Sequence, residues 1–257
     1  MPPSSADDAL YHCCRLSLNL ISLPTFLACH FIQAPYGRHL RSGWGPTIPS
    51  WLSWILMECP AVFFSLLIYP FGRHASSLQS LTLLSIFLLH YIHRSFIYPL
   101  RLPRKTASVF PVSISLMAFS FNLLNSYVQI RWVSHYANYD SDEWFLGRFA
   151  GGLAVFITGM VVNVKSDLVL VGLKAQGGGY KIPRSGLFEL VSCPNYLGEI
   201  IEWLGWAIMT WSWAGFGFFL YTSANLVPRA MGNHKWYLEK FKEEYPKNRK
   251  AVIPFLY

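Results

Sequence analysis

Long apolar runs alternate with short polar segments along this chain. A membrane-spanning helix needs about 20 mostly apolar residues, and the runs that meet this length cover residues 10–32, 51–71, 78–98, 110–132 and 144–170. A polar stretch over 171–194 follows, and then an apolar run over 195–226. As one helix that last run would be about 48 Å long, too long for a single span. We therefore expect it to break near 211–217 into helices over 195–211 and 214–228.

This pattern predicts an all-α, polytopic membrane protein. Seven transmembrane helices follow from the five single runs and the divided last run, in a single domain over residues 1–257. The tail after Pro228 is charged and aromatic, and it predicts a short surface helix over 237–244. We find no alternation typical of strands and no internal repeat.

Composition supports a membrane protein. Of the 257 residues, 53% are hydrophobic and only 13% are charged, against about 25% charged in soluble domains. Aromatic residues reach 17%, with ten Trp, as expected for rings at both membrane interfaces. The net charge of +8 lies in loops and in the tail, so nucleic-acid binding is not expected.

Basic residues are distributed unevenly between the two sets of loops. With the C-terminus in the cytosol, the cytosolic segments hold Arg38, Arg41, Arg101, Arg104, Lys105, Lys174, Lys181, Arg184 and the basic residues from Arg229 to Lys250. The opposite side holds few basic residues and an acidic cluster: Arg15, Arg73, Arg131, Arg148, Asp140, Asp142 and Glu143. The positive-inside rule then places the N-terminus outside the cytosol.

The sequence lacks the common motifs for zinc binding, disulfide frameworks and Rossmann-type nucleotide binding. The five cysteines show no zinc spacing and no disulfide framework, so we expect packing residues and no metal: Cys13, Cys14, Cys29, Cys59 and Cys193. Gly177-Gly-Gly-Tyr180 neither follows a strand nor fits the dinucleotide fingerprint, which favours a loop and a non-Rossmann nucleotide site. Asp7 and Asp8, without a basic segment, predict no cleaved signal peptide.

Ionisable residues lie inside the apolar runs, where burial of their charge is costly. Glu58 lies in the second run, and it could be either functional or a structural carboxyl bonded to a neighbouring helix. In the third run His90 and Arg94 share a face at i, i+4, and Tyr91 is rotated away by about 100°. The alternative for His93 and Arg94 is snorkelling at the helix end.

Two further polar faces lie near the end of the fifth predicted span and at the start of the sixth. Asn163 and Asp167 lie one turn apart, and Asn195, Glu199 and Glu202 follow at i, i+4, i+7. A hydrogen-bond ladder between helices is one interpretation. Two carboxylates without a cation in their own span favour another, in which neighbouring cytosolic cations hold a charged cofactor with them: Lys174, Lys181, Arg184 and Arg229.

Several motifs agree in order and spacing with one family. They are residues 180–203 (YKIPRSGLFELVSCPNYLGEIIEW), 90–94 (HYIHR), 159–167 (GMVVNVKSD) and 245–257 (YPKNRKAVIPFLY). From about residue 30 to its end the chain resembles the steroid 5α-reductases. Residues 33–39 (QAPYGRH), 43–46 (GWGP) and 233–237 (NHKWY) resemble the plant branch, which acts in brassinosteroid biosynthesis.

The resemblance implies seven spans in the endoplasmic reticulum membrane and an NADPH-dependent enzyme. It implies reduction of the Δ4 double bond of 3-oxo-Δ4 steroids of the campest-4-en-3-one type, with the sterol and membrane lipids as partners. Glu58 and Tyr91 match the family residues that hold the steroid carbonyl. Cofactor contacts match Asn163, Asp167, Lys174, Tyr180, Lys181, Asn195, Glu199, Arg229, Asn233, His234 and Tyr237. Lys174 and Lys181 replace Arg of the animal enzymes, and Asn233 replaces His; Lys keeps the charge without the bidentate geometry.

The chemistry of an enone fits these residue types. Hydride addition to the β carbon leaves negative charge on the carbonyl oxygen, which a buried Tyr91 hydroxyl can stabilise, and a protonated Glu58 can donate a second hydrogen bond. Rival functions are a trans-2-enoyl-CoA reductase, a membrane lipid methyltransferase and a non-catalytic sterol-binding protein. Glu58 together with Tyr91 favours a reductase, because methyl transfer needs no carbonyl clamp.

Overall fold

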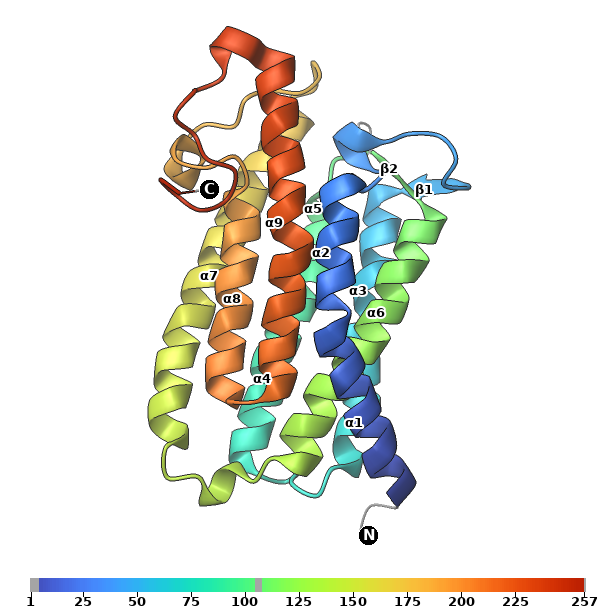
Figure 1. The fold of residues 1–257 in the computed structure, drawn as a ribbon, viewed down its shortest axis with the longest axis vertical. Helices are drawn as coiled ribbons and strands as arrows, with labels where there is room; N and C mark the ends of the chain where they lie inside the picture. Colours follow the sequence, from blue (N-terminus) through green and yellow to red (C-terminus); the bar gives the residue numbers. More distant parts are fainter. Residues whose placement is uncertain (1–4, 105–107, 257) are drawn as a thin grey trace.

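The chain folds into an elongated bundle of helices that run along one axis (Figure 1). The computed structural model describes residues 5–104 and 108–256. Lys105, counted among the basic positions, and Tyr257, the last residue of the resembling C-terminal run, lie outside the described residues. The helices are α1 (Ser5–Leu20), α2 (Ser22–Phe31), α3 (Ser50–Ile68), α4 (Leu78–Ile92), α5 (Tyr98–Arg101), α6 (Val112–Arg131), α7 (Phe145–Ala175), α8 (Pro194–Thr210) and α9 (Trp213–Phe241).

The predominantly helical fold is confirmed. Three helical segments are long and apolar enough to cross a membrane: Ser50–Phe71, Leu78–Arg101 and Phe145–Ala175. They correspond to the second, third and fifth predicted spans. Helices α1, α2 and α8 have 16, 10 and 17 residues, fewer than the 20 or so of an average span, and α6 carries Asn122, Asn125, Gln129 and Arg131.

The first predicted span, over 10–32, is two helices instead of one. Helix α1 ends at Leu20 and α2 begins at Ser22. Pro24 accounts for the break, because it has no N–H to donate to the carbonyl of Leu20 and its ring crowds that carbonyl. The flanking bonds persist, from Ile21 N to Ser17 O (2.9 Å) and from Thr25 N to Ile21 O (3.0 Å), so the segment is kinked and not folded back.

The predicted break in the last apolar run is confirmed. Helix α8 ends at Thr210, and the C-cap residue Trp211 adopts the left-handed conformation at φ 46°. Ser212 then caps α9 by accepting a hydrogen bond from Gly215 N at 2.9 Å. The two helices lie side by side and antiparallel (Figure 1).

Two predicted boundaries were wrong. Helix α7 continues past residue 170 to Ala175, so that Lys174 lies on the helix and not in the polar stretch. The surface helix predicted over 237–244 is not a separate element, because α9 runs without interruption through Pro228 to Phe241 and a single turn, Lys242–Glu244, follows. The sequence becomes charged after Pro228, but a helix does not need apolar side chains to keep its backbone hydrogen bonds. The change in polarity therefore did not mark the end of the helix.

The sequence analysis missed a small antiparallel sheet of β1 (Thr47–Pro49) and β2 (Val109–Pro111). Three residues are too few for alternation to be visible. The sheet ties together the starts of α3 and α6, where Ser50 N donates to Ser108 O and Val112 N donates to Pro46 O, both at 2.8 Å.

Glycines bring α7 and α8 into backbone contact. A Cβ on Gly159 would collide with Glu202 N and Gly198 O, and one on Gly205 would collide with Phe156 N. Gly152 is packed in the same way against Gly205 O. Small residues allow such close approach between helices in membranes, and here they place the polar face of α7 directly against that of α8.

Candidate active site

A cavity of about 1100 Å³ lies inside the bundle. Residues of α2, α3, α4, α6, α7, α8 and α9, and of the segment before β1, line it. Its wall is largely apolar, with Trp54, Trp203 and Phe218 among the larger side chains. The polar residues that line it include Arg38, His39, Glu58, His90, Tyr91, Arg94, Asn122, Asp167, Lys174, Asn195, Glu199, Arg229 and Asn233.

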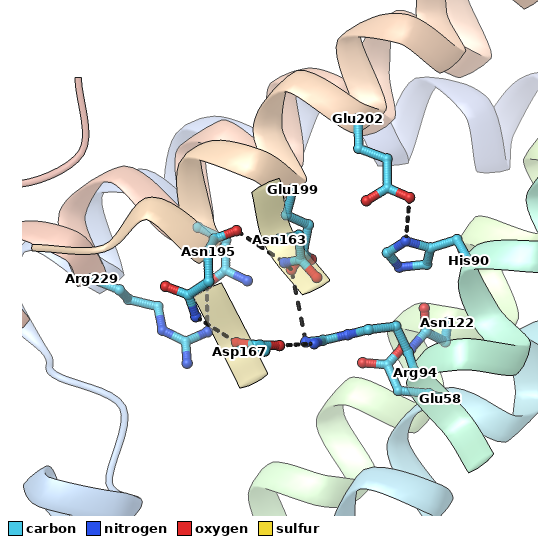
Figure 2. Close-up of polar contacts among 11 residues, drawn as sticks. Glu58, His90, Arg94, Asn122, Asn163, Asp167, Asn195, Glu199, Glu202 and Arg229 are labelled. Atoms are coloured by element: carbon cyan, nitrogen blue, oxygen red, sulfur yellow. Dashed lines mark hydrogen bonds and ion pairs between the residues drawn. The ribbon is translucent and has the colours of Figure 1, made fainter. Parts of the chain in front are cut away.

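Arg94 occupies the centre of the polar wall (Figure 2). Its Nη1 donates to Asp167 Oδ2 at 2.8 Å, and its Nη2 lies 3.7 Å from Glu199 Oε2. The guanidinium also lies 4.4 Å from the centre of the Trp54 ring. Because Arg94 is only 7% exposed, the snorkelling alternative is wrong for this residue. The π-helical turn that contains it, His93–Ile97, is an element that often occurs at functional sites.

The carboxylates of α8 are paired with α4. His90 Nδ1 and Glu202 Oε1 lie 2.8 Å apart, and Glu202 is fully buried. Glu199 lies beside Arg94, as described above. Both carboxylates therefore have basic neighbours on the third predicted span, and the charged cofactor expected among the cations at the end of the bundle stays a prediction.

Amide groups connect α7 to α8. Asn195 Nδ2 donates to Asp167 Oδ1 at 3.0 Å, and Asn163 Nδ2 donates to the Asn195 carbonyl at 2.9 Å. Asn163 also lies within 3.5 Å of Glu199 Oε2. The two polar faces predicted from spacing thus meet as one network, which the glycine contact between the helices makes possible (Figure 2).

Glu58 and Tyr91 meet at Asn122. The Asn122 amide donates to Glu58 Oε2 at 3.2 Å and to the Met57 carbonyl at 2.7 Å. Its oxygen accepts from the Tyr91 hydroxyl at 3.4 Å. The sequence analysis did not single out Asn122, although Asn122, Asn125 and Gln129 recur at i, i+3, i+7 in an apolar run, a signal that could have identified this face.

Cations gather toward the end of the cavity near β1 and β2. Lys174 from α7 and Arg229 from α9 line it there, together with Arg38. The Arg38 guanidinium lies among three rings, 5.4 Å from the centre of Tyr180, 4.7 Å from Trp236 and 4.4 Å from Tyr237. The sequence analysis placed Arg38 only among the basic loop residues.

His39 adjoins this group. Its Nε2 lies 3.1 Å from Asn233 Oδ1. Burial lowers the pKa of His39 below its ordinary value, and the neighbouring Arg38 and Arg41 lower it further. The hydrogen bond with Asn233 opposes this shift in pKa, and through that bond His39 adds a polar contact to this end of the cavity.

Eight of the residues predicted from sequence line the cavity: Glu58, Tyr91, Asp167, Lys174, Asn195, Glu199, Arg229 and Asn233. The other five that the resemblance matched to the site are not among the lining residues: Asn163, Tyr180, Lys181, His234 and Tyr237. Tyr237 accepts a hydrogen bond from Arg38 at 3.1 Å. Lys181 Nζ donates to Gln176 Oε1 at 2.8 Å in an exposed contact, and His234 Nδ1 lies 2.6 Å from Ser192 Oγ.

The fold and the cavity define the class, a helical membrane protein with a polar site buried in its bundle. The family model described as 3-oxo-5-alpha-steroid 4-dehydrogenase matches residues 108–257. Steroid 5-alpha-reductase DET2 of Gossypium hirsutum is 60% identical over 257 residues, covering 98% of this chain and all of that protein. The protein of the same name from Arabidopsis thaliana is 57% identical, with 98% of each chain covered. 3-oxo-5-alpha-steroid 4-dehydrogenase 1 of Homo sapiens is 41% identical, with 86% of each chain covered.

The chain belongs to the 3-oxo-5-alpha-steroid 4-dehydrogenase family, and the resemblance stated from its motifs is confirmed.

Proposed function

We propose that this enzyme reduces the Δ4 double bond of 3-oxo-Δ4 steroids of the campest-4-en-3-one type to 5α-dihydro steroids, with NADPH, in brassinosteroid biosynthesis. The observation that carries the proposal is the meeting of Glu58 and Tyr91 at Asn122, on the wall of a cavity that holds cations at its other end. Glu58 and Tyr91 can hold a carbonyl, and the cations at the other end of the cavity can hold phosphates. Full-length relatives named as steroid 5-alpha-reductases support the same reaction.

The size of the cavity and the cations that line it support NADPH as the cofactor. A pocket for one small molecule has about 300–1,000 Å³, so a cavity of about 1100 Å³ has room for a substrate beside part of a dinucleotide. Arg38, Lys174 and Arg229 would bind the phosphates. Arg38 Nη1 is buried without a hydrogen-bond partner among the described residues, as expected of a donor that serves a ligand.

The remaining matched residues would act on the cofactor directly or through neighbours. Asp167, Asn195, Glu199 and Asn233 line the cavity. Tyr180 and Tyr237 hold Arg38 between their rings. Asn163 supports Asn195 and Glu199. We propose Lys181 and His234 as outer contacts near the same end.

NADPH, when bound, would supply the hydride, which side chains alone cannot provide. Tyr91 would donate a hydrogen bond to the steroid carbonyl oxygen and stabilise the enolate that hydride addition to the β carbon leaves. Uptake of a proton at the α carbon would then restore the ketone. Glu58 accepts from Asn122 through Oε2, so a proton on its other oxygen can be donated to the same carbonyl. The apolar wall excludes water, which strengthens both hydrogen bonds.

We propose that seven segments cross the endoplasmic reticulum membrane, with the C-terminus in the cytosol. In support, the segments that hold Arg38, Arg101, Lys174 and the C-terminal tail lie at one end of the bundle, whereas the N-terminus lies at the other (Figure 1). The sterol would enter from the lipid phase between α2 and α6. In support of this route, Leu116 and Met117 of α6 line the cavity and are 59% and 65% exposed.

The test is direct assay of the purified protein in detergent. With NADPH, campest-4-en-3-one or progesterone should be converted to the 5α-dihydro product, identified by mass spectrometry against 5α and 5β standards. Conversion of a trans-2-enoyl-CoA without conversion of either steroid would overturn the proposal.

A further inference from the structure

A line of buried side-chain hydrogen bonds leads from α8 through α6 to Tyr91. Trp206 Nε1 donates to Gln129 Oε1 at 2.9 Å, and Gln129 Nε2 donates to Asn125 Oδ1 at 3.2 Å. Asn125 Nδ2 then donates to the Tyr91 oxygen at 3.2 Å. All four residues are at most 2% exposed, so water does not compete for these bonds.

The groups around Gln129 determine which side chains donate and which accept in this series of hydrogen bonds. The indole N–H of Trp206 can only donate, and the Ala214 carbonyl, which accepts from Gln129 Nε2 at 2.8 Å, can only accept. Together they leave one orientation for the Gln129 amide. The Gln129 N–H that faces Asn125 requires an oxygen there, so Asn125 presents its NH₂ group to Tyr91.

The consequence for Tyr91 concerns its single hydroxyl hydrogen. A phenol oxygen accepts or donates according to how the hydroxyl rotates. Because the oxygen already accepts from Asn125, the hydrogen points away from Asn125, toward Asn122 and the cavity. The bond to Asn122 Oδ1 is 3.4 Å long, beyond the usual 2.5–3.0 Å or so for two oxygens, and is therefore weak enough to be exchanged for a ligand.

Asn122 cannot reverse this arrangement. Its NH₂ group is held by the Met57 carbonyl at 2.7 Å, an acceptor only, so its oxygen faces Tyr91. Tyr91 thus lies between a donor on one side and an acceptor on the other. A hydrogen-bonded oxygen of this kind is also a better donor, because successive hydrogen bonds polarise one another.

We propose that Asn125 and Gln129 are positioning residues that commit Tyr91 to donate its hydroxyl hydrogen to the substrate carbonyl. The inference rests on the proposed function, since it needs a carbonyl oxygen at Tyr91. A donor that is already oriented needs no reorganisation when charge develops on that oxygen. Neither Asn125 nor Gln129 lines the cavity, so both act through Tyr91.

The test is a double-mutant cycle in the steroid assay. Asn125→Leu keeps the size of the side chain and removes the donor, and it should lower kcat about tenfold, the effect of one lost hydrogen bond. In the Tyr91→Phe background the same substitution should lower kcat no further, because no hydroxyl remains to be oriented. An equal loss in both backgrounds, or no loss in either, would overturn the proposal.

Controls separate positioning from folding. Ser126→Ala on the same helix, also fully buried, should leave kcat unchanged. Gln129→Met breaks the preceding link and frees the Asn125 amide to rotate, so it should repeat the cycle result if Asn125→Leu does not fold. If the wild-type protein converts no 3-oxo-Δ4 steroid, the proposed function fails and this inference with it; an active wild type with additive losses overturns this inference alone.

Discussion

Arg94 Nη1 lies 2.8 Å from Asp167 Oδ2, and this buried pair joins the π-helical turn that follows α4 to α7. The side chains are 8% and 7% exposed. Asp167 is also held by Asn195 of α8 at 3.0 Å. One carboxylate therefore organises three helices around the proposed cofactor site.

Arg94→Gln should destabilise the protein strongly. Removal of one partner from a buried pair leaves the other charge uncompensated, at a cost of about 3–5 kcal/mol. Thermal unfolding in detergent without NADPH should show a midpoint lower by several degrees, and Arg94→Gln/Asp167→Asn should recover part of that loss. Lys235→Gln, which removes an exposed pair with Glu239, is the control and should shift the midpoint little. Equal shifts of the unfolding midpoint for the buried and the exposed pair would contradict the stabilising role of the Arg94–Asp167 pair.

Glu58→Gln and Tyr91→Phe should each lower turnover by about 100-fold or more, the range for a lost oxyanion donor or general acid. Since both act on one oxygen, the double variant should be little worse than either single one. NADPH binding, followed by fluorescence, should be nearly unchanged, because the cofactor is expected on Asn163, Asp167, Asn195 and Glu199. Normal turnover in Tyr91→Phe would make that residue a bystander, and loss of NADPH binding would assign it to the cofactor or the fold.

Lys174→Ala should raise the KM for NADPH by about tenfold, the effect of a lost charged contact, and should raise that for NADH far less. Lys181→Ala should act in the same direction with a smaller effect, because Lys181 Nζ is bonded to Gln176 in an exposed contact, whereas Lys174 lines the cavity. Lys240→Ala, at an exposed position of α9, provides the matched loss of charge. Equal effects on both cofactors would show that these lysines do not bind the extra phosphate.

Glycosylation can test the membrane orientation. The chain contains no Asn-x-Ser/Thr acceptor, so any glycosylation that is detected must be at the engineered site. An acceptor with a flexible spacer, inserted after Asp140 in the 134–143 segment, should be glycosylated in cells, because that segment is expected in the lumen. One inserted after Glu243, beyond Lys240, should remain unmodified. Modification of the second site instead of the first would reverse the orientation.

Polar spacing predicted much of the site. Asn163 and Asp167 on one span, and Asn195, Glu199 and Glu202 on the next, were expected on single faces, and the structure places these faces together. The i, i+4 spacing of His90 and Arg94 likewise placed them on one face. Spacing along a helix cannot say which helix a face meets, so it did not pair Glu199 with Arg94 or Glu202 with His90.

The sequence by itself determined that the chain is helical, with apolar runs long enough to cross a membrane, because apolar length and charge scarcity act locally. Tertiary structure alone decided which buried groups neutralise one another. The glycine contact of Gly159 with Gly198 sets the distance between α7 and α8, and the rotation of α4 and α6 brings Arg94 to Asp167 and Asn125 to Tyr91. Helix order and rotation are properties of the whole bundle, so no local pattern encodes these pairings.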